Sequence, residues 1–203
     1  MFKCLKLLNK FTNKKNIMRK IFSILLIIIG INTVVYSQIT SLGGGITFAT
    51  GAKYELEGLK YYNNTKALDL QINYCINKHS SIVNKLNLFY PKKETLAGDD
   101  EFSKTSLFIL CTDYHYTPNP KNFLRLYYIG GPTFMLWKIK DQHYSSALNS
   151  DYNIDEYKFS AGIDLGIGIN FDISNSYKLF IETKYIISKN NQLLFTSGVS
   201  YIL

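Results

Sequence analysis

The chain contains three histidines, and these are the residues at which acid–base chemistry would start. They are His79, His115 and His143. His143 lies between Asp141 and Ser145. A lipid hydrolase needs a serine and a histidine, with an acid to orient the histidine. Three such residues at alternate positions are more typical of one solvated face of a loop. We therefore predict no catalytic residues and no enzymatic activity.

Other groupings that could bind a ligand are equally weak. Asp99-Asp100-Glu101 offers oxygen ligands that suit Ca²⁺, but a solvated acidic loop explains it better. The glycines at 162, 166 and 168 suggest a nucleotide-binding loop, yet no helix follows them. We predict no metal site, no cofactor and no cofactor-binding residues.

The net charge of +8 is concentrated at the start of the chain. Seven basic residues precede residue 21 with no acid among them, and the other 16 basic residues are nearly balanced by 15 acidic ones. A basic chain can bind nucleic acid, but this distribution gives the remainder no such character. We predict that nucleic acid is not a partner.

Residues 21–31 form an apolar run directly after Arg19-Lys20. The run is too short for a transmembrane helix, which needs roughly 20 residues. A basic flank followed by a short apolar core is typical of a secretory signal peptide. We predict a basic lead-in and signal peptide at 1–37, with Met18 as an alternative start, and one domain at 38–203. An uncleaved membrane anchor is the alternative.

Two cysteines remain after the leader, Cys75 and Cys111. Export into an oxidising compartment would allow them to pair. The interpretation that we favour is two small apolar fillers, and the disulfide stays open as the alternative.

The strongest structural signal is a two-residue period in 157–173. Every odd position is apolar and every even position is polar or glycine. Only a strand separates side chains into two such classes, because a helix would spread them around its circumference. Similar alternation occurs in 42–48, 68–77, 177–188 and 193–203, whereas 80–90, 102–116 and 122–137 are rich in β-formers but alternate poorly. The sequence predicts about eight strands.

The polar face of these strands decides the class of barrel. Gly162, Gly166 and Gly168 share that face with Asp164 and Asn170, and small residues among polar ones suit a narrow polar lumen inside an apolar, lipid-facing wall. We predict an all-β protein, an antiparallel up-and-down transmembrane β-barrel. An extracytoplasmic soluble β-sandwich is the alternative.

Several charged residues would then point into the lumen: Asp69, Asp164, Asp172, Lys178, Glu182 and Lys184, with Arg125 joining them. Burying charges is costly unless they pair, and eight strands enclose an interior that side chains just fill. We therefore predict an ion-paired, plugged lumen. Aromatic residues at the strand ends suit interfacial girdles.

The lengths of the joins orient the barrel. Long joins at 50–65, 91–101 and 139–156 alternate with short ones at 78–80, 117–121 and 174–176, while the last join, 189–191, is short. Short turns on the periplasmic side and long loops outside are typical of outer-membrane barrels. Both termini are predicted on the periplasmic side.

Four glycine-rich segments resemble the PorT-type outer-membrane β-barrel family of Gram-negative bacteria: 43–48, 129–134, 162–168 and 197–201. The likeness covers most of 38–203. One departure is Leu203, where barrels often end in phenylalanine. The resemblance implies a cell-envelope protein of the outer membrane, and for some members a link to protein secretion.

Together these observations favour a monomeric outer-membrane protein with a structural or partner-interaction role. Its expected partners are outer-membrane lipid and an envelope protein that binds the long outer loops. The alternatives are a narrow solute channel and a lipid-modifying outer-membrane enzyme.

Overall fold

The computed structural model of the chain describes residues 39–203, apart from 57–58, 63, 96–101 and 146–149. The predicted lead-in and signal peptide therefore lie outside the described residues. None of the described segments is a helix long and apolar enough to cross a membrane.

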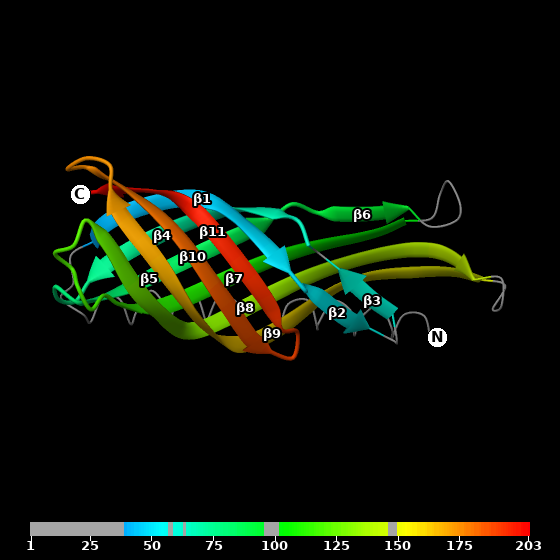
Figure 1. The fold of residues 1–203 in the computed structure, drawn as a ribbon. Coiled ribbons are helices and arrows are strands. Elements are labelled where there is room, and N and C mark those ends of the chain that lie inside the picture. Colours follow the sequence, from blue (N-terminus) through cyan, green and yellow to red (C-terminus); the bar gives the residue numbers. More distant parts are fainter. Residues whose placement is uncertain (1–38, 57–58, 63, 96–101, 146–149) are drawn as a thin grey trace. The chain divides into compact units, whose positions relative to one another are not determined.

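Eight long strands form a closed antiparallel barrel (Figure 1). The neighbours in the wall follow the chain order, and the barrel closes where β1 pairs with β11. The predicted up-and-down topology and the count of eight are confirmed. The wall strands are β1 (Ile39–Thr50), β4 (Lys66–Cys75), β5 (Ser80–Phe89), β7 (Phe102–Tyr116), β8 (Leu124–Ser145), β9 (Ser150–Asp172), β10 (Tyr177–Ser188) and β11 (Gln192–Ile202).

The alternation along β9 divides its side chains as predicted. Ser160 and Asp164 are buried inside the barrel, whereas Ile163 and Leu165 point outward and are 60% and 55% exposed. Large apolar side chains are exposed in the same way on the other wall strands. A soluble sandwich would bury this face, so the exterior is that of a barrel surrounded by lipid.

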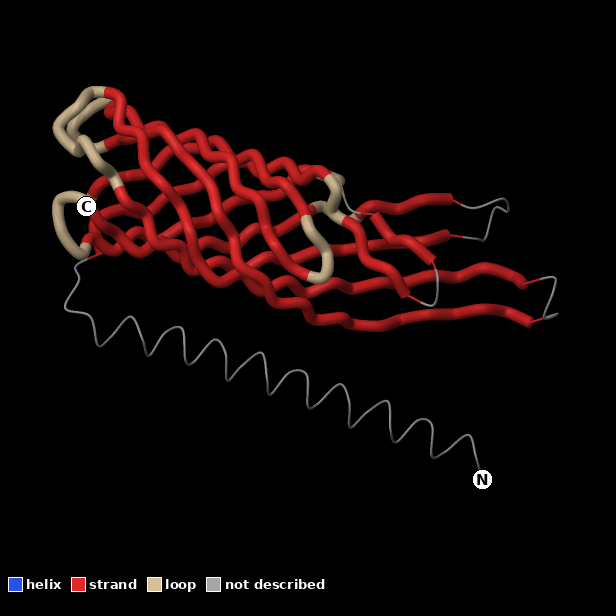
Figure 2. The backbone as a smooth tube through the Cα atoms, turned by 60° about the horizontal axis from the view of Figure 1, so that its bottom comes forward, coloured by secondary structure: helices blue, strands red, loops and turns tan. Residues whose placement is uncertain are grey.

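Three short turns lie at one end of the barrel, where Figure 2 shows them as compact tan loops. The β4–β5 turn is closed by the amide of Ile76, which donates to Ser80 O at 2.9 Å, and the β9–β10 turn by the same bond from Ile173 to Tyr177. The C-terminal end is anchored there as well, since the Leu203 amide donates to Thr40 O at 3.0 Å. Both ends of the barrel domain lie on the short-turn side, as predicted.

Each of the three long joins at the opposite end contains strand among its described residues, which corrects their prediction as loops. The first contains the hairpin β2 (Lys53–Leu56) and β3 (Leu59–Tyr62), and the second contains β6 (Lys92–Thr95). In the third, β8 and β9 stay paired as far as Ser145 and Ser150. Outside the membrane a strand needs no lipid-facing apolar side, so these segments show no alternation.

Candidate functional site

An alternating chain of charges crosses the middle of the barrel. Lys85 of β5 pairs with Glu182 of β10, and its Nζ lies 3.8 Å from Asp113 Oδ2 of β7. Lys184 of β10 donates to the same Asp113 oxygen at 2.8 Å and to Asp164 Oδ2 of β9 at 3.2 Å. The order is therefore Glu182–Lys85–Asp113–Lys184–Asp164, and each of these side chains is almost completely buried.

Neutral groups also donate to the carboxylates of this charge chain. The Tyr127 hydroxyl donates to Glu182 Oε1 at 2.8 Å, and Thr133 Oγ1 donates to Asp164 Oδ2 at 2.6 Å. His115 stacks on the Tyr127 ring with centroids 4.8 Å apart. Tyr127 fits because its cross-strand partner is Gly168, and a Cβ there would collide with the ring. The predicted role of inward glycines in making room is confirmed at this position.

One further carboxylate lies inside the barrel without a direct partner. Asp69 of β4 is fully buried, and neither of its oxygens has a hydrogen-bond partner among the described residues. In and beside the ion chain, two buried lysines therefore accompany four buried carboxylates, those of Asp69, Asp113, Asp164 and Glu182. Carboxylates therefore outnumber lysines in this part of the interior.

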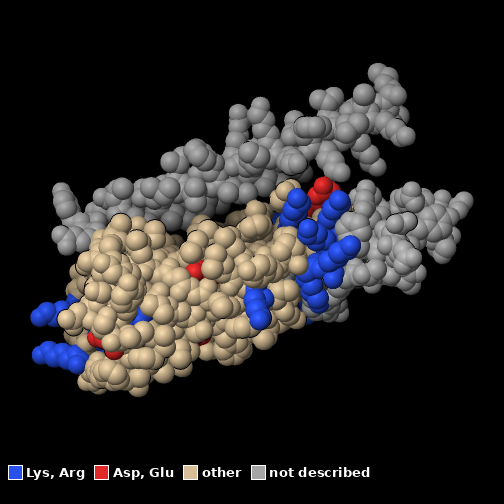
Figure 3. All heavy atoms as spheres, turned by 90° about the horizontal axis from the view of Figure 1, so that it is seen from above, with Lys and Arg blue, Asp and Glu red and all other residues tan. Residues whose placement is uncertain are grey.

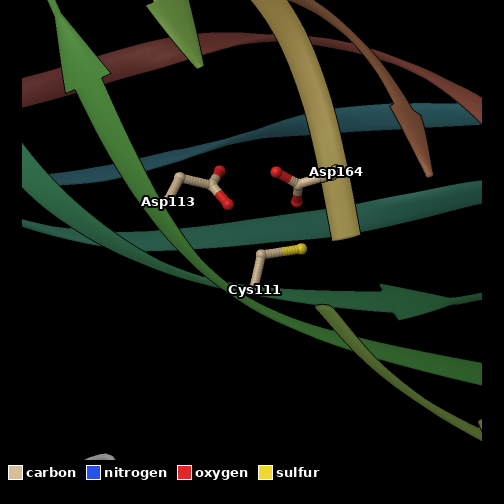
Figure 4. A group of neighbouring side chains, drawn as sticks. All are labelled: Cys111, Asp113 and Asp164. Atoms are coloured by element: carbon tan, nitrogen blue, oxygen red, sulfur yellow. The ribbon is translucent and has the colours of Figure 1, made fainter. Parts of the chain in front are cut away.

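Cys111, Asp113 and Asp164 bring one sulfur and two carboxylates within 4.8 Å of one another (Figure 4). Such donors could bind a metal ion. Here the Lys184 ammonium already contacts both carboxylates. This ammonium supplies the positive charge that a metal ion would bring, so the two carboxylates are members of the ion chain.

Beyond the ion chain, towards the long hairpins, a cluster of apolar side chains occupies much of the interior. Leu107, Met135, Trp137 and Ile139 point inward from β7 and β8 and are 0% exposed. They belong to a buried cluster that also includes Ala49, Ala52, Ala67, Phe89, Ile109, Cys111, Ile154, Ile186 and Leu194. Side chains thus fill the lumen at two levels, one charged and one apolar. The ion-paired plug was predicted, and the apolar plug was not.

The prediction that the remaining charged residues point into the lumen is only partly correct. Arg125 pairs with Asp172 near the short-turn end, where the Asp172 side chain is 40% exposed. Lys178 is half-buried at the same end. These residues line the mouth of the barrel, and Asp69, Asp164, Glu182 and Lys184 lie deep inside.

The three histidines lie on three separate elements of the fold. His79 is exposed in the β4–β5 turn, and its Nδ1 lies 3.0 Å from Thr117 O. Asp141 and His143 lie on strand β8 and not in a loop, which corrects the prediction, and Asp141 is buried rather than solvated. The side chains of His143 and Ser145 lie outside the described residues, as does the whole segment Asp99–Glu101.

Sequence reasoning missed Lys85 and Asp113. The strands that carry them bear apolar residues on both faces, because the apolar plug also needs inward side chains. The signal that could have found them is a polar residue isolated in an otherwise apolar strand. The two cysteines are free, with Cys75 exposed and Cys111 buried.

A closed barrel of eight strands with an apolar exterior and a charged, filled interior is a transmembrane β-barrel of the outer-membrane type. Solved structures agree with this fold. OprG of Pseudomonas aeruginosa superposes with a TM-score of 0.61 at 10% identity, covering 82% of this chain and 97% of that one. Ail of Yersinia pestis, in complex with the heparin analogue sucrose octasulfate, gives 0.55 at 14%, covering 81% and 97%.

Neisserial surface protein A gives a TM-score of 0.52 at 13% identity, covering 80% of this chain and 96% of that one. At these identities the likeness concerns the fold. The chain matches no protein-family model and no curated protein sequence.

Proposed function

We propose that this chain is a monomeric outer-membrane protein that presents a rigid sheet to a protein partner of the cell envelope. The observation that carries the proposal is the length of β9. It pairs with β10 only from Gly162 onward, whereas its pairing with β8 begins at Ser150. Residues 150–161 therefore have one strand edge that no described strand covers.

This edge belongs to a four-stranded extension of the barrel. Beyond the wall, β6, β7, β8 and β9 remain hydrogen-bonded in that order. An unpaired edge offers a row of amide and carbonyl groups, and a partner's extended segment can add to it as a further strand. A preformed sheet binds at a lower ordering cost than a flexible loop.

The filled lumen favours this role over a solute channel. The ion chain and the apolar plug occupy successive levels of the interior, and both are buried. We also propose that the chain has no hydrolase activity, since none of the described side chains forms a serine–histidine pair with an acid. The finer likeness to the PorT-type family, and with it a link to protein secretion, stays a prediction.

Shortening the β8–β9 hairpin tests the proposal. Ile139 and Glu156 are directly paired, so deleting 139–156 and joining the ends with Asn-Gly keeps the register and removes seven of the twelve residues of the open edge. Deleting the β2–β3 hairpin between its paired ends Lys53 and Tyr62 is the control. We expect photo-crosslinking from position 157 in whole cells to give one defined adduct, which is lost only in the first variant.

Both variants should keep heat-modifiable gel mobility, which reports a folded barrel. An adduct that survives the 139–156 deletion, or is lost equally in the control, would contradict the proposal. Export of secreted proteins in a strain that lacks the gene would test the secretion link separately.

A further inference from the structure

Three successive rows of outward-facing side chains change from apolar to cationic where the barrel wall continues into the sheet extension. The first row is Phe108, Leu136 and Phe159 on neighbouring strands β7, β8 and β9. Phe108 and Phe159 are exposed, at 39% and 47%. This row belongs to the lipid-facing wall.

The second row lies two residues further along each strand, which is about 7 Å. It consists of Ser106, Lys138 and Tyr157, again directly opposite one another. Lys138 Nζ lies 5.3 Å from the centre of the Tyr157 ring. Tyrosine and lysine with long apolar stems are typical of the boundary between hydrocarbon and headgroups.

The third row carries the charge. Lys93 of β6 lies opposite Lys104 of β7, and Lys104 lies opposite Lys140 of β8. Asp155 of β9 follows, so the row holds three positive charges and one negative. We call Lys93, Lys104 and Lys140 the lysine row.

An anion that lies across such a row gains several charge-assisted contacts. On the face that Figure 3 shows, the wall is almost free of charged side chains, while lysines and arginines gather towards the ends. The cationic groups thus lie beyond the apolar wall.

We propose that the lysine row binds the phosphate groups of an anionic glycolipid in the surrounding leaflet. The position of the lysine row along the strands, relative to the lipid-facing wall, supports this choice of ligand. The row begins only one step beyond the Lys138–Tyr157 boundary and two steps beyond the lipid-facing phenylalanines. A lipid that packs on the apolar row therefore holds its phosphates level with the lysines, whereas a soluble polyanion would gain nothing from the apolar row.

The test measures binding of bisphosphorylated lipid A to the full protein purified in detergent. The variant K104Q/K140Q removes two charges of the lysine row. The matched control is K78Q/K121Q, which removes two exposed lysines from short turns at the other end. Since a lysine near an anionic surface contributes about 1 kcal/mol, we expect the affinity to fall roughly 25-fold in the first variant and to stay unchanged in the control.

Lipid A without its phosphates should bind weakly to every variant. Equal losses in both double variants would show unspecific charge attraction and overturn the proposal. So would equal binding of the dephosphorylated lipid. Equally tight binding of soluble heparin would assign the row to a soluble polyanion instead. If K104Q/K140Q lacks heat-modifiable mobility, K93Q on the edge strand β6 takes its place, with about a fivefold loss expected.

Discussion

Replacing Lys184 by methionine tests whether the buried ion chain holds the barrel together. The Lys184 ammonium contacts Asp113 at 2.8 Å and Asp164 at 3.2 Å, and all three side chains are at most 1% exposed. A hydrogen bond to a charged group contributes about 1.5–3 kcal/mol, and removing one partner of a buried ion pair costs about 3–5 kcal/mol. Two such bonds contribute about 3–6 kcal/mol, and the ion-pair estimate lies within that range, so we expect K184M to lose about 3–5 kcal/mol.

Urea unfolding of the protein folded in lipid vesicles would measure this loss. Trp137 is the only tryptophan of the chain and is fully buried, so its fluorescence reports the folded interior. The matched control is K178M on the same strand, where the lysine is half-buried near the mouth. We expect that substitution to cost less than about 1 kcal/mol.

A second substitution separates charge from packing. In K184M/D164N one uncompensated carboxylate is removed, while Asp113 keeps Lys85 at 3.8 Å and Thr133 can still donate to position 164. The double variant should regain roughly 2 kcal/mol relative to K184M. If K184M costs no more than K178M, or if D164N restores nothing, the ion chain does not have the stabilising role that its geometry assigns to it.

Three other results are expected. G131A should abolish heat-modifiable folding, because a Cβ at position 131 would collide with the backbone of the neighbouring strand. A Cβ at position 130 would have its nearest neighbours at 3.4 Å or more, so G130A should fold. Equal behaviour of the two variants would refute the steric argument. Cys75 should react with a maleimide in the folded protein while Cys111 does not, as read by mass spectrometry, and fast labelling of Cys111 would show that the interior is open. The protein should give no large single-channel conductance in planar bilayers, and a steady conductance would overturn the filled lumen.

The sequence by itself determined the wall of this barrel. Alternation in 157–173 separates the side chains of a strand whatever lies on either side of it, so Ile163 and Asp164 could be assigned to opposite faces in advance. The alternating long and short joins then placed both termini at one end, and the Leu203–Thr40 hydrogen bond lies there. These features are local in the chain.

The tertiary structure decided what meets inside and beyond the wall. Lys85, Asp113 and Lys184 come from three different strands, so their pairing depends on barrel closure and strand register, which no local pattern records. The apolar plug made β7 and β8 apolar on both faces and hid their alternation. The lysine row likewise exists only because register aligns single lysines from β6, β7 and β8.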